Sequence, residues 1–212
     1  MEVIVINAGV LSNLIILFLI ILISTGWFST FINNVGSKRT VIIFLLFTYI
    51  LTFIELPYIF GLRINIGGFI LPVIGSVFLL IKVIRKDIIH MLTATFLLGA
   101  SYFLIKEIIR LDPVLLIVDE KYEIPPLIIA FVIFVIPKLI NRIYLIISGI
   151  MTGEFIYIYQ HQVIFDGFIL GSGEARDIMW LAIVEIIILE YFLGGILSFI
   201  KNKKYYNLLK LR

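Results

Sequence analysis

The chain has 212 residues, contains no cysteine and carries a formal net charge of +3 at neutral pH. Apolar residues make up 62% of it and charged residues 15%, whereas soluble domains hold about 45–50% and about 25% respectively. This composition excludes an ordinary soluble domain, and the missing cysteine excludes disulfides, thiol catalysis and thiolate metal sites. The basic residues stand at the ends of apolar runs, so no nucleic-acid partner is expected.

Apolar runs of about 17–25 residues recur along the whole chain, and each is long enough to cross a hydrocarbon layer about 30 Å thick. We therefore predict an all-α fold, a polytopic transmembrane helix bundle of about seven helices that forms one integral membrane domain over residues 1–212. The predicted helices cover 9–31, 40–60, 66–84, 88–109, 124–140, 143–160 and 178–200, and a basic cytoplasmic tail follows at 201–212.

Residues 124–160 could form one helix or two. A single helix would be about 55 Å long, much more than a bilayer needs. It would also place the basic residues of 82–86 and of 201–212 on opposite sides of the membrane. Two helices joined by a tight turn after Pro137, near Lys138 and Arg142, satisfy both length and charge.

The distribution of Lys and Arg predicts the orientation, because cytoplasmic loops of membrane proteins are enriched in both. With the amino terminus outside and the carboxyl terminus inside, twelve of the seventeen basic residues are cytoplasmic. They are Lys38, Arg39, Lys82, Arg85, Lys86, Lys138, Arg142, Lys201, Lys203, Lys204, Lys210 and Arg212. In this topology the cytoplasmic half of the bundle is expected to be dry.

Three glutamates fall in the outer half of the predicted helices, where an ionisable group is a candidate functional residue because its burial in lipid is unfavourable. Lys106 and Arg110 lie one helical turn apart and are suitable partners, and His161 shares a helix face with one glutamate. The predicted outward-facing polar cluster comprises Glu55, Glu154, Glu185, Lys106, Arg110 and His161. The simpler interpretation is that these carboxylates only bond to neighbouring helices or are protonated.

Two further motifs stand out. Asp112, Pro113 and Asp119 belong to a loop that could lie on the outer interface or cover the polar cluster. Gly149 and Gly153 form a G-x-x-x-G pattern, which favours close helix packing within the bundle or, alternatively, self-association.

Known catalytic signatures are missing from the sequence, including H-E-x-x-H, G-x-S-x-G and the Walker loop. Two isolated histidines, His90 and His161, make a poor set of metal ligands. No catalytic residue, cofactor or metal is therefore expected, and an enzyme is disfavoured.

Three segments resemble the YphA-type small membrane proteins of endospore-forming Gram-positive bacteria. They are Ile66–Pro72, Leu111–Tyr122 and Gly149–Phe155. The resemblance implies a multi-pass protein of the bacterial cytoplasmic membrane and draws attention to Asp112, Asp119 and Glu154, while it leaves the function open.

Together these features predict a non-enzymatic protein that acts by binding, either as a scaffold or regulatory partner of other membrane proteins or as a bundle with an outer polar pocket. The expected partners are the lipid bilayer and other membrane proteins or a second copy of the chain. The first alternative is a small-solute or ion carrier that uses the intramembrane glutamates, which needs a polar path through the inner half. An enzyme acting on lipid is the third alternative.

Overall fold

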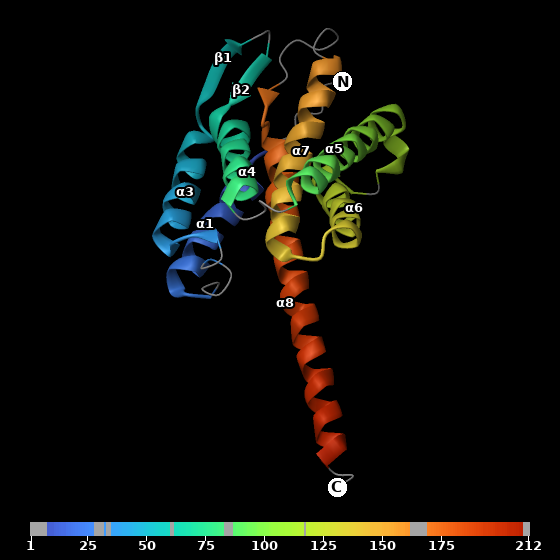
Figure 1. The fold of residues 1–212 in the computed structure, drawn as a ribbon. Coiled ribbons are helices and arrows are strands. Elements are labelled where there is room, and N and C mark those ends of the chain that lie inside the picture. The colour runs from blue at the N-terminus through green and yellow to red at the C-terminus, as the bar shows by residue number, and fades with distance from the viewer. Residues whose placement is uncertain are drawn as a thin grey trace.

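A computed structural model describes residues 8–27, 32, 35–59, 62–82, 87–116, 118–161 and 169–209, and it is mainly helical (Figure 1). Within these residues there are seven α-helices, the predicted number, and also a small sheet that was not predicted. The elements are α1 (Val10–Thr25), α3 (Lys38–Leu51), β1 (Glu55–Ile59), β2 (Leu62–Asn65), η1 (Ile66–Ile70), α4 (Leu71–Lys82), α5 (Ile88–Leu111), η2 (Pro113–Leu115), α6 (Glu120–Val135), α7 (Leu139–His161), β3 (Ile169–Leu170) and α8 (Gly173–Leu209).

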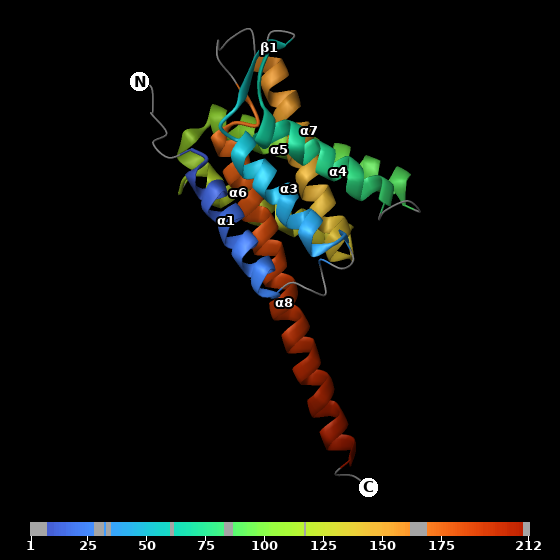
Figure 2. The same cartoon turned by 90° about the vertical axis from the view of Figure 1, so that its left-hand side faces the viewer.

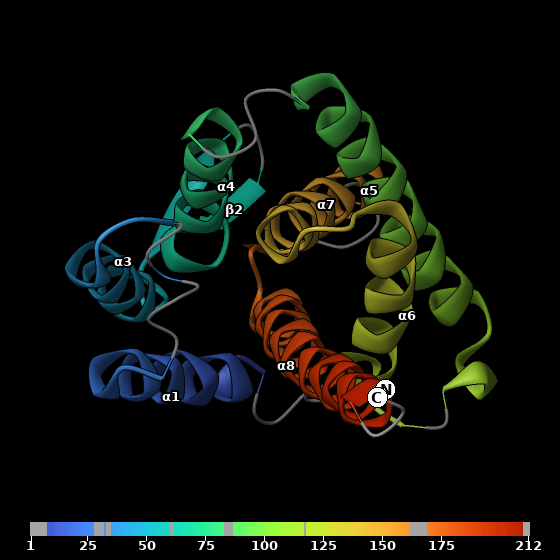
Figure 3. The same cartoon turned by 60° about the horizontal axis from the view of Figure 1, so that its bottom comes forward.

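The helices form two groups when the molecule is viewed along the bundle (Figure 3). Helices α1, α3 and α4 make up the first group, and α5, α6, α7 and α8 make up the second. The most extensive contact between helices joins α5 to α7, while the two groups meet where α1 packs on α8 and α4 packs on α7. A continuous core of buried apolar side chains runs through both groups.

Helix α1 ends at Thr25, several residues before the predicted end at 31, because Gly26 adopts a left-handed conformation with φ 93°. The amide groups of Gly26 and Trp27 donate back to Ile23 and Leu22, both at 3.1 Å. This arrangement satisfies the last carbonyls of the helix and turns the chain away from its axis. The predicted residues 28–31 lie outside the described residues.

The predicted helix over 40–60 is wrong in its second part. Helix α3 ends at Leu51, and the chain continues into β1, which pairs antiparallel with β2. Pro57 explains the change, because proline has no amide proton and also disfavours the helical conformation of the residue before it. Glu55 consequently opens a strand and is exposed, so it is not a helical residue.

The sheet is completed by β3, which pairs parallel with β2, so the order is β1-β2-β3. Asn65, at the end of β2, is 4% exposed and bonds in two directions. Its Nδ2 donates to Thr52 O at 2.7 Å, and its Oδ1 accepts from Gly68 N at 2.7 Å. Asn65 therefore connects the end of α3 to the start of the next helical segment.

The predicted helix over 66–84 begins with a π-helical segment, η1, before α4 continues to Lys82. Pro72 lacks the amide proton that a regular α-helix would use at this point, which accounts for the wider turn. Gly67 allows this segment to approach α3 closely, because a Cβ there would lie 2.4 Å from Thr52 N. The predicted residues 83–84 lie outside the described residues.

Helices α6 and α7 are separate, with a short turn around Pro137. Helix α6 begins at Glu120 rather than at 124, because the Asp119 side chain caps it by accepting from Lys121 N. It ends at Val135, and Ile136 before the proline is extended.

Helix α8 has 37 residues and is therefore about 55 Å long. It begins beside the sheet, and its second half projects far beyond the other helices (Figures 1 and 2). The predicted helix 178–200 is thus part of a longer one, and the predicted tail at 201–212 is helical as far as Leu209. Residues 210–212 lie outside the described residues.

Asp177 on α8 links the two helix groups at the start of α1. It is fully buried. Its carboxylate accepts hydrogen bonds from Gly9 N at 2.9 Å and from Ser12 N at 2.7 Å. These amides belong to the residue before α1 and to its first turn, so a residue 165 positions from Ser12 in the sequence caps the helix.

Candidate functional site

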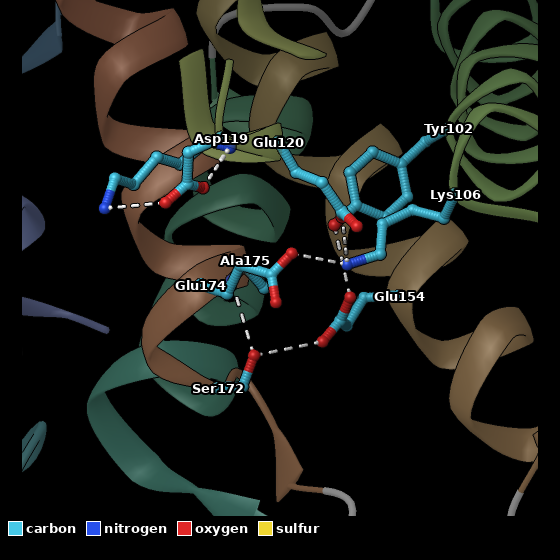
Figure 4. Close-up of polar contacts among 9 residues, drawn as sticks. Tyr102, Lys106, Asp119, Glu120, Glu154, Ser172, Glu174 and Ala175 are labelled. Atoms are coloured by element: carbon cyan, nitrogen blue, oxygen red, sulfur yellow. Dashed lines mark hydrogen bonds and ion pairs between the residues drawn. The ribbon is translucent and has the colours of Figure 1, made fainter. Parts of the chain in front are cut away.

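Lys106 is the centre of a buried polar cluster in the second helix group (Figure 4). Its Nζ lies 2.7 Å from Glu174 Oε1 and 3.1 Å from Glu120 Oε2. The Lys106 side chain is only 10% exposed. Since Lys106 is on α5, Glu120 on α6 and Glu174 on α8, a single ammonium group joins three helices.

Glu154 brings the fourth helix, α7, into the same cluster and is 4% exposed. Its Oε2 accepts from Tyr102 OH at 3.2 Å, and its Oε1 accepts from Ser172 Oγ at 3.4 Å. Ser172 precedes the first residue of α8, and its Oγ also accepts from Ala175 N at 3.3 Å. We refer to Tyr102, Lys106, Glu120, Glu154, Ser172 and Glu174 as the Lys106 cluster.

The carboxyl groups of Glu120 and Glu174 have different affinities for protons. Burial raises the pKa of Glu120 to about 7, against the opposing influence of Lys106. Burial also acts to raise the pKa of Glu174, but the charge of Lys106 and a hydrogen bond from Glu120 hold it below its usual value. A hydrogen bond between the two carboxyls raises the pKa of Glu120 and lowers that of Glu174. The protonation of one carboxyl therefore depends on that of the other.

A second ionic group lies beside the Lys106 cluster and contains Arg110 and His161 from the prediction. Both side chains pair with Glu107, Arg110 through an i,i+3 contact and His161 through Nε2 at 3.3 Å. The His161 ring also stacks near Tyr157, with centroids 4.7 Å apart, and Lys106 Nζ lies 5.4 Å from the Tyr157 ring centroid. Tyr157 therefore stands between the two ionic groups.

The structure thus brings Glu154, Lys106, Arg110 and His161 into one region. In the described part of the chain, Glu55 and Glu185 form no hydrogen bond or ion pair with any of them. Glu55 is exposed on β1, and Glu185 is half-buried on α8. Of the three predicted glutamates, Glu154 alone makes direct contacts within the Lys106 cluster among the described residues.

The predicted loop motif shapes the chain next to the cluster. Asp112 Oδ1 accepts from Val114 N at 3.2 Å, and Pro113 is the first residue of η2. Asp119 Oδ1 accepts from Lys121 N at 3.2 Å, and its Oδ2 lies 3.1 Å from Lys121 Nζ. By capping α6, Asp119 positions the following residue, Glu120, for its contact with Lys106.

Sequence reasoning missed Tyr102, Glu120 and Glu174 as members of the cluster. Two local signals were available, because Asp119-Glu120 and Ser172-Gly-Glu174 each place a capping side chain before an acidic first turn. These signals indicate where helices begin, but they do not reveal which cation on another helix the carboxylates meet.

The predicted dry inner half also needs correction. Thr95 Oγ1 and Ser148 Oγ lie 2.9 Å apart between α5 and α7, and Tyr144 OH lies 3.3 Å from Thr95. Further along α7, Arg142 Nη1 donates to Glu190 Oε2 at 2.7 Å. A broken row of buried polar groups therefore continues from the Lys106 cluster along α7.

Gly149 and Gly153 face α5 within the same chain. A Cβ on Gly149 would lie 2.5 Å from Leu98 Cδ2, and one on Gly153 would lie 2.5 Å from Gly99 O. These glycines allow the close packing of α5 on α7. Among the residues that the structure describes, no group of three or more His, Cys, Asp and Glu side chains could hold a metal ion.

A second candidate site is an apolar groove of about 310 Å³ between the two helix groups. We call it the lateral groove. A smaller neighbouring cavity of about 140 Å³ shares Phe44 and Trp180 with it. The lateral groove is lined by Val35, Gly36, Ser37, Thr40, Val41, Phe44, Thr48, Pro72, Ile74, Gly75, Phe78, Leu79, Ile147, Met179 and Trp180.

Large apolar side chains are widely exposed on the outside of the helices. Phe134 is 91% exposed, Ile89 83% and Phe18 56%. Among the described residues, α5 and α7 are long and apolar enough to cross a membrane. Ion-paired side chains enclosed by helices with apolar outer surfaces define a helical integral membrane protein.

The chain belongs to the family of YphA-like integral membrane proteins, whose family model matches residues 14–207. This match confirms the resemblance noted in the sequence. No curated protein and no solved structure matches the chain significantly.

Proposed function

We propose that this protein is a non-enzymatic, membrane-embedded binding protein that holds a lipid acyl chain in the lateral groove. The proposal rests mainly on the chemistry of the groove lining. Among the described residues that line it, none carries a titratable side chain, and the polar groups are limited to Ser37, Thr40, Thr48 and the Trp180 indole. A ligand in such a site is held by apolar contact and is not transformed.

The surroundings of the groove indicate where its ligand comes from. Phe47 on α3 and Ile74 and Phe78 on α4 are 56%, 54% and 45% exposed. In a bilayer these surfaces face hydrocarbon, so an acyl chain enters the groove laterally without crossing water. The volume of about 310 Å³ lies within the range of known ligand pockets, roughly 300–1,000 Å³.

The Lys106 cluster contributes to this function as a structural joint. Lys106 is already matched by Glu120 and Glu174, and Glu154 is bonded to Tyr102 and Ser172. Such internal pairing favours a fixed arrangement of α5 to α8 over an open polar pocket. A rigid second group then provides one wall of the groove.

Topology and location form part of the proposal. The charge distribution supports a multi-pass protein of the bacterial cytoplasmic membrane with its amino terminus outside and its carboxyl terminus inside. Other membrane proteins or a second copy of the chain are proposed as further partners. Because Gly149 and Gly153 are engaged with α5, self-association would use a different surface.

Native mass spectrometry of the purified full chain tests lipid binding. The wild-type protein should retain phospholipid, while Val41→Trp should fill the groove and lose it. Val41 lines the groove and is half-buried. Ile89→Trp, which adds the same side chain at an exposed site on α5, is the matched control and should retain lipid. Equal retention by all three proteins, or by none, would refute the proposal.

A small-solute or ion carrier is the second candidate, supported by the row of buried polar groups along α7. This function requires ions or protons to pass between Glu154 and Ser148, where the hydroxyl of Thr152 already donates to Ser148 O at 2.7 Å. Ion or proton flux in proteoliposomes that is abolished by Glu154→Gln, but not by Glu185→Gln, would favour this function. The absence of flux in the wild-type protein would reject it.

A further inference from the structure

We propose that the lateral groove selects an anionic phospholipid, with an acyl chain along α3 and the phosphate beside Lys38 and Arg39. This inference rests on the proposed lipid-binding function and adds the chemical class of the headgroup. The evidence comes from the polarity of the two ends of the groove, the charges at one end and an aromatic residue that marks the interface.

The lateral groove runs along α3, and its two ends differ in exposure and polarity. Its lining follows α3 from Ser37 and Thr40 at the start of the helix to Thr48 near its end, a rise of about 16 Å. Val41 and Phe44 form the wall between these points. The hydroxyls of Ser37 and Thr40 contact each other at 2.7 Å and are exposed at the beginning of the helix. The groove is therefore open and polar where a headgroup would lie, and apolar along the path of the chain.

Among the described residues, the same end of the groove carries positive charge that no acidic side chain compensates. Lys38 and Arg39 occupy the first turn of α3, which contains no acidic residue, and both are exposed. Lys38 Nζ donates to the backbone oxygen of Ser24 at 2.7 Å, and this neutral acceptor holds the ammonium in place without cancelling its charge. Arg39 forms no hydrogen bond or ion pair with the described residues. A phosphate group complements this pair of cations.

Trp27 gives an independent indication of depth. It directly follows the left-handed Gly26 that ends α1, and it is 75% exposed. Lys38 is bonded to Ser24, so Trp27 and the groove mouth lie at the same end of the first helix group. Exposed tryptophan is typical of the headgroup level of a bilayer. The charges at the mouth are thus placed where phosphates occur and the groove extends from there into hydrocarbon.

The experiment compares headgroups on matched acyl chains. The purified full chain is exchanged into nanodiscs of dioleoyl phosphatidylglycerol mixed equally with dioleoyl phosphatidylcholine, and bound lipid is counted by native mass spectrometry. The wild-type protein should retain phosphatidylglycerol preferentially. Arg39→Gln should reduce that preference about fivefold, and Arg39→Lys should keep it, because one interfacial charge contributes about that factor.

Lys138→Gln is the matched control, because it removes one exposed positive charge on the same predicted side from the turn before α7, and not from the start of α3 where the groove opens. It should leave the preference unchanged, and an equal loss in both glutamine variants would overturn the proposal. Equal retention of the two lipids by the wild-type protein would overturn the headgroup assignment while upholding acyl-chain binding. Retention of neither lipid would overturn the proposed function as well.

Discussion

Asp177 on α8 caps α1, and it does so with both carboxylate oxygens, one on Gly9 N and one on Ser12 N. The contact connects helices near the two ends of the chain and is buried completely. Such a charge-assisted pair of hydrogen bonds fastens the first helix group to the second at the end where the sheet lies.

Replacing Asp177 should therefore separate the two groups. We expect Asp177→Ala to lower the free energy of unfolding by about 2–4 kcal/mol, because two buried amides lose charged acceptors. Thermal unfolding in detergent measures the effect. Asp87→Asn is the matched control, since Asp87 stands before α5 without a side-chain cap and should be neutral. A similar melting temperature for wild type and Asp177→Ala would show that the cap contributes little.

Lys106→Met should be among the most damaging substitutions in the chain. It leaves Glu120, Glu154 and Glu174 near one another without their cation, and breaking a buried pair in this way costs about 3–5 kcal/mol. Arg110→Gln is the comparison, because Arg110 is 36% exposed and its contact with Glu107 is a surface pair, so a much smaller loss is expected. Both variants can be ranked by their unfolding temperature in the same detergent.

Glu120 should make stability depend on pH. Its pKa rises from 4.5 to about 7 in the folded protein, so the folded state favours the protonated form. The contribution of Glu120 to the free energy of unfolding is complete below about pH 4.5 and is lost as the pH rises through about 7. Glu174, whose pKa is lowered, acts in the opposite sense and only at lower pH.

Between pH 5 and pH 8, the melting temperature of the wild-type protein should consequently fall by a few degrees more than that of Glu120→Gln. Glu123→Gln removes a half-buried carboxylate that lies outside the Lys106 cluster in the same turn of α6, and it should retain the wild-type slope. Identical slopes in all three proteins would mean that Glu120 does not hold the proton.

The two glycines on α7 should differ in their tolerance of alanine. At Gly153 the new Cβ would meet the backbone oxygen of Gly99, which cannot move without shifting α5, whereas at Gly149 it would meet only side-chain atoms, the Cδ2, Cγ and Cβ of Leu98 at 2.5, 2.7 and 2.9 Å. We expect a loss of about 1–3 kcal/mol for Gly153→Ala and a smaller one for Gly149→Ala. Gly36→Ala, where no atom lies within 4 Å of the new Cβ, provides the baseline for chemical unfolding.

Hydropathy and charge predicted the number of helices, because the length and composition of an apolar run are local properties. The boundaries were less predictable where a single residue decides them. Gly26 ends α1 through its backbone conformation, and Pro57 turns the second predicted helix into a hairpin. Both residues were visible in the sequence, but an apolar run conceals their effect when only mean hydropathy is considered.

The candidate site was partly predictable, because the depth of a charged residue in a predicted helix can also be read from the local sequence. A deep lysine needs a carboxylate, so the proximity of Lys106 and Glu154 could be expected from their depths alone. The direct partners Glu120 and Glu174 sit at helix starts, and their approach to Lys106 depends on how α6 and α8 are inclined to α5. The lateral groove depends on inclination as well, since it is a space between two helix groups and has no sequence motif.

Because α8 is long, its free end lies far from the Lys106 cluster. One end of this helix is fixed by Ser172, Glu174 and Asp177, while its other end extends past the remaining helices. The carboxylate of Glu190 also binds Arg142 on α7, so the freely projecting part of α8 is the stretch of about 28 Å after this residue, and a tilt of about 5° there would move the free end by about 2–3 Å. The last turns of α8 are thereby presented to neighbouring molecules well away from the helices that hold its first half.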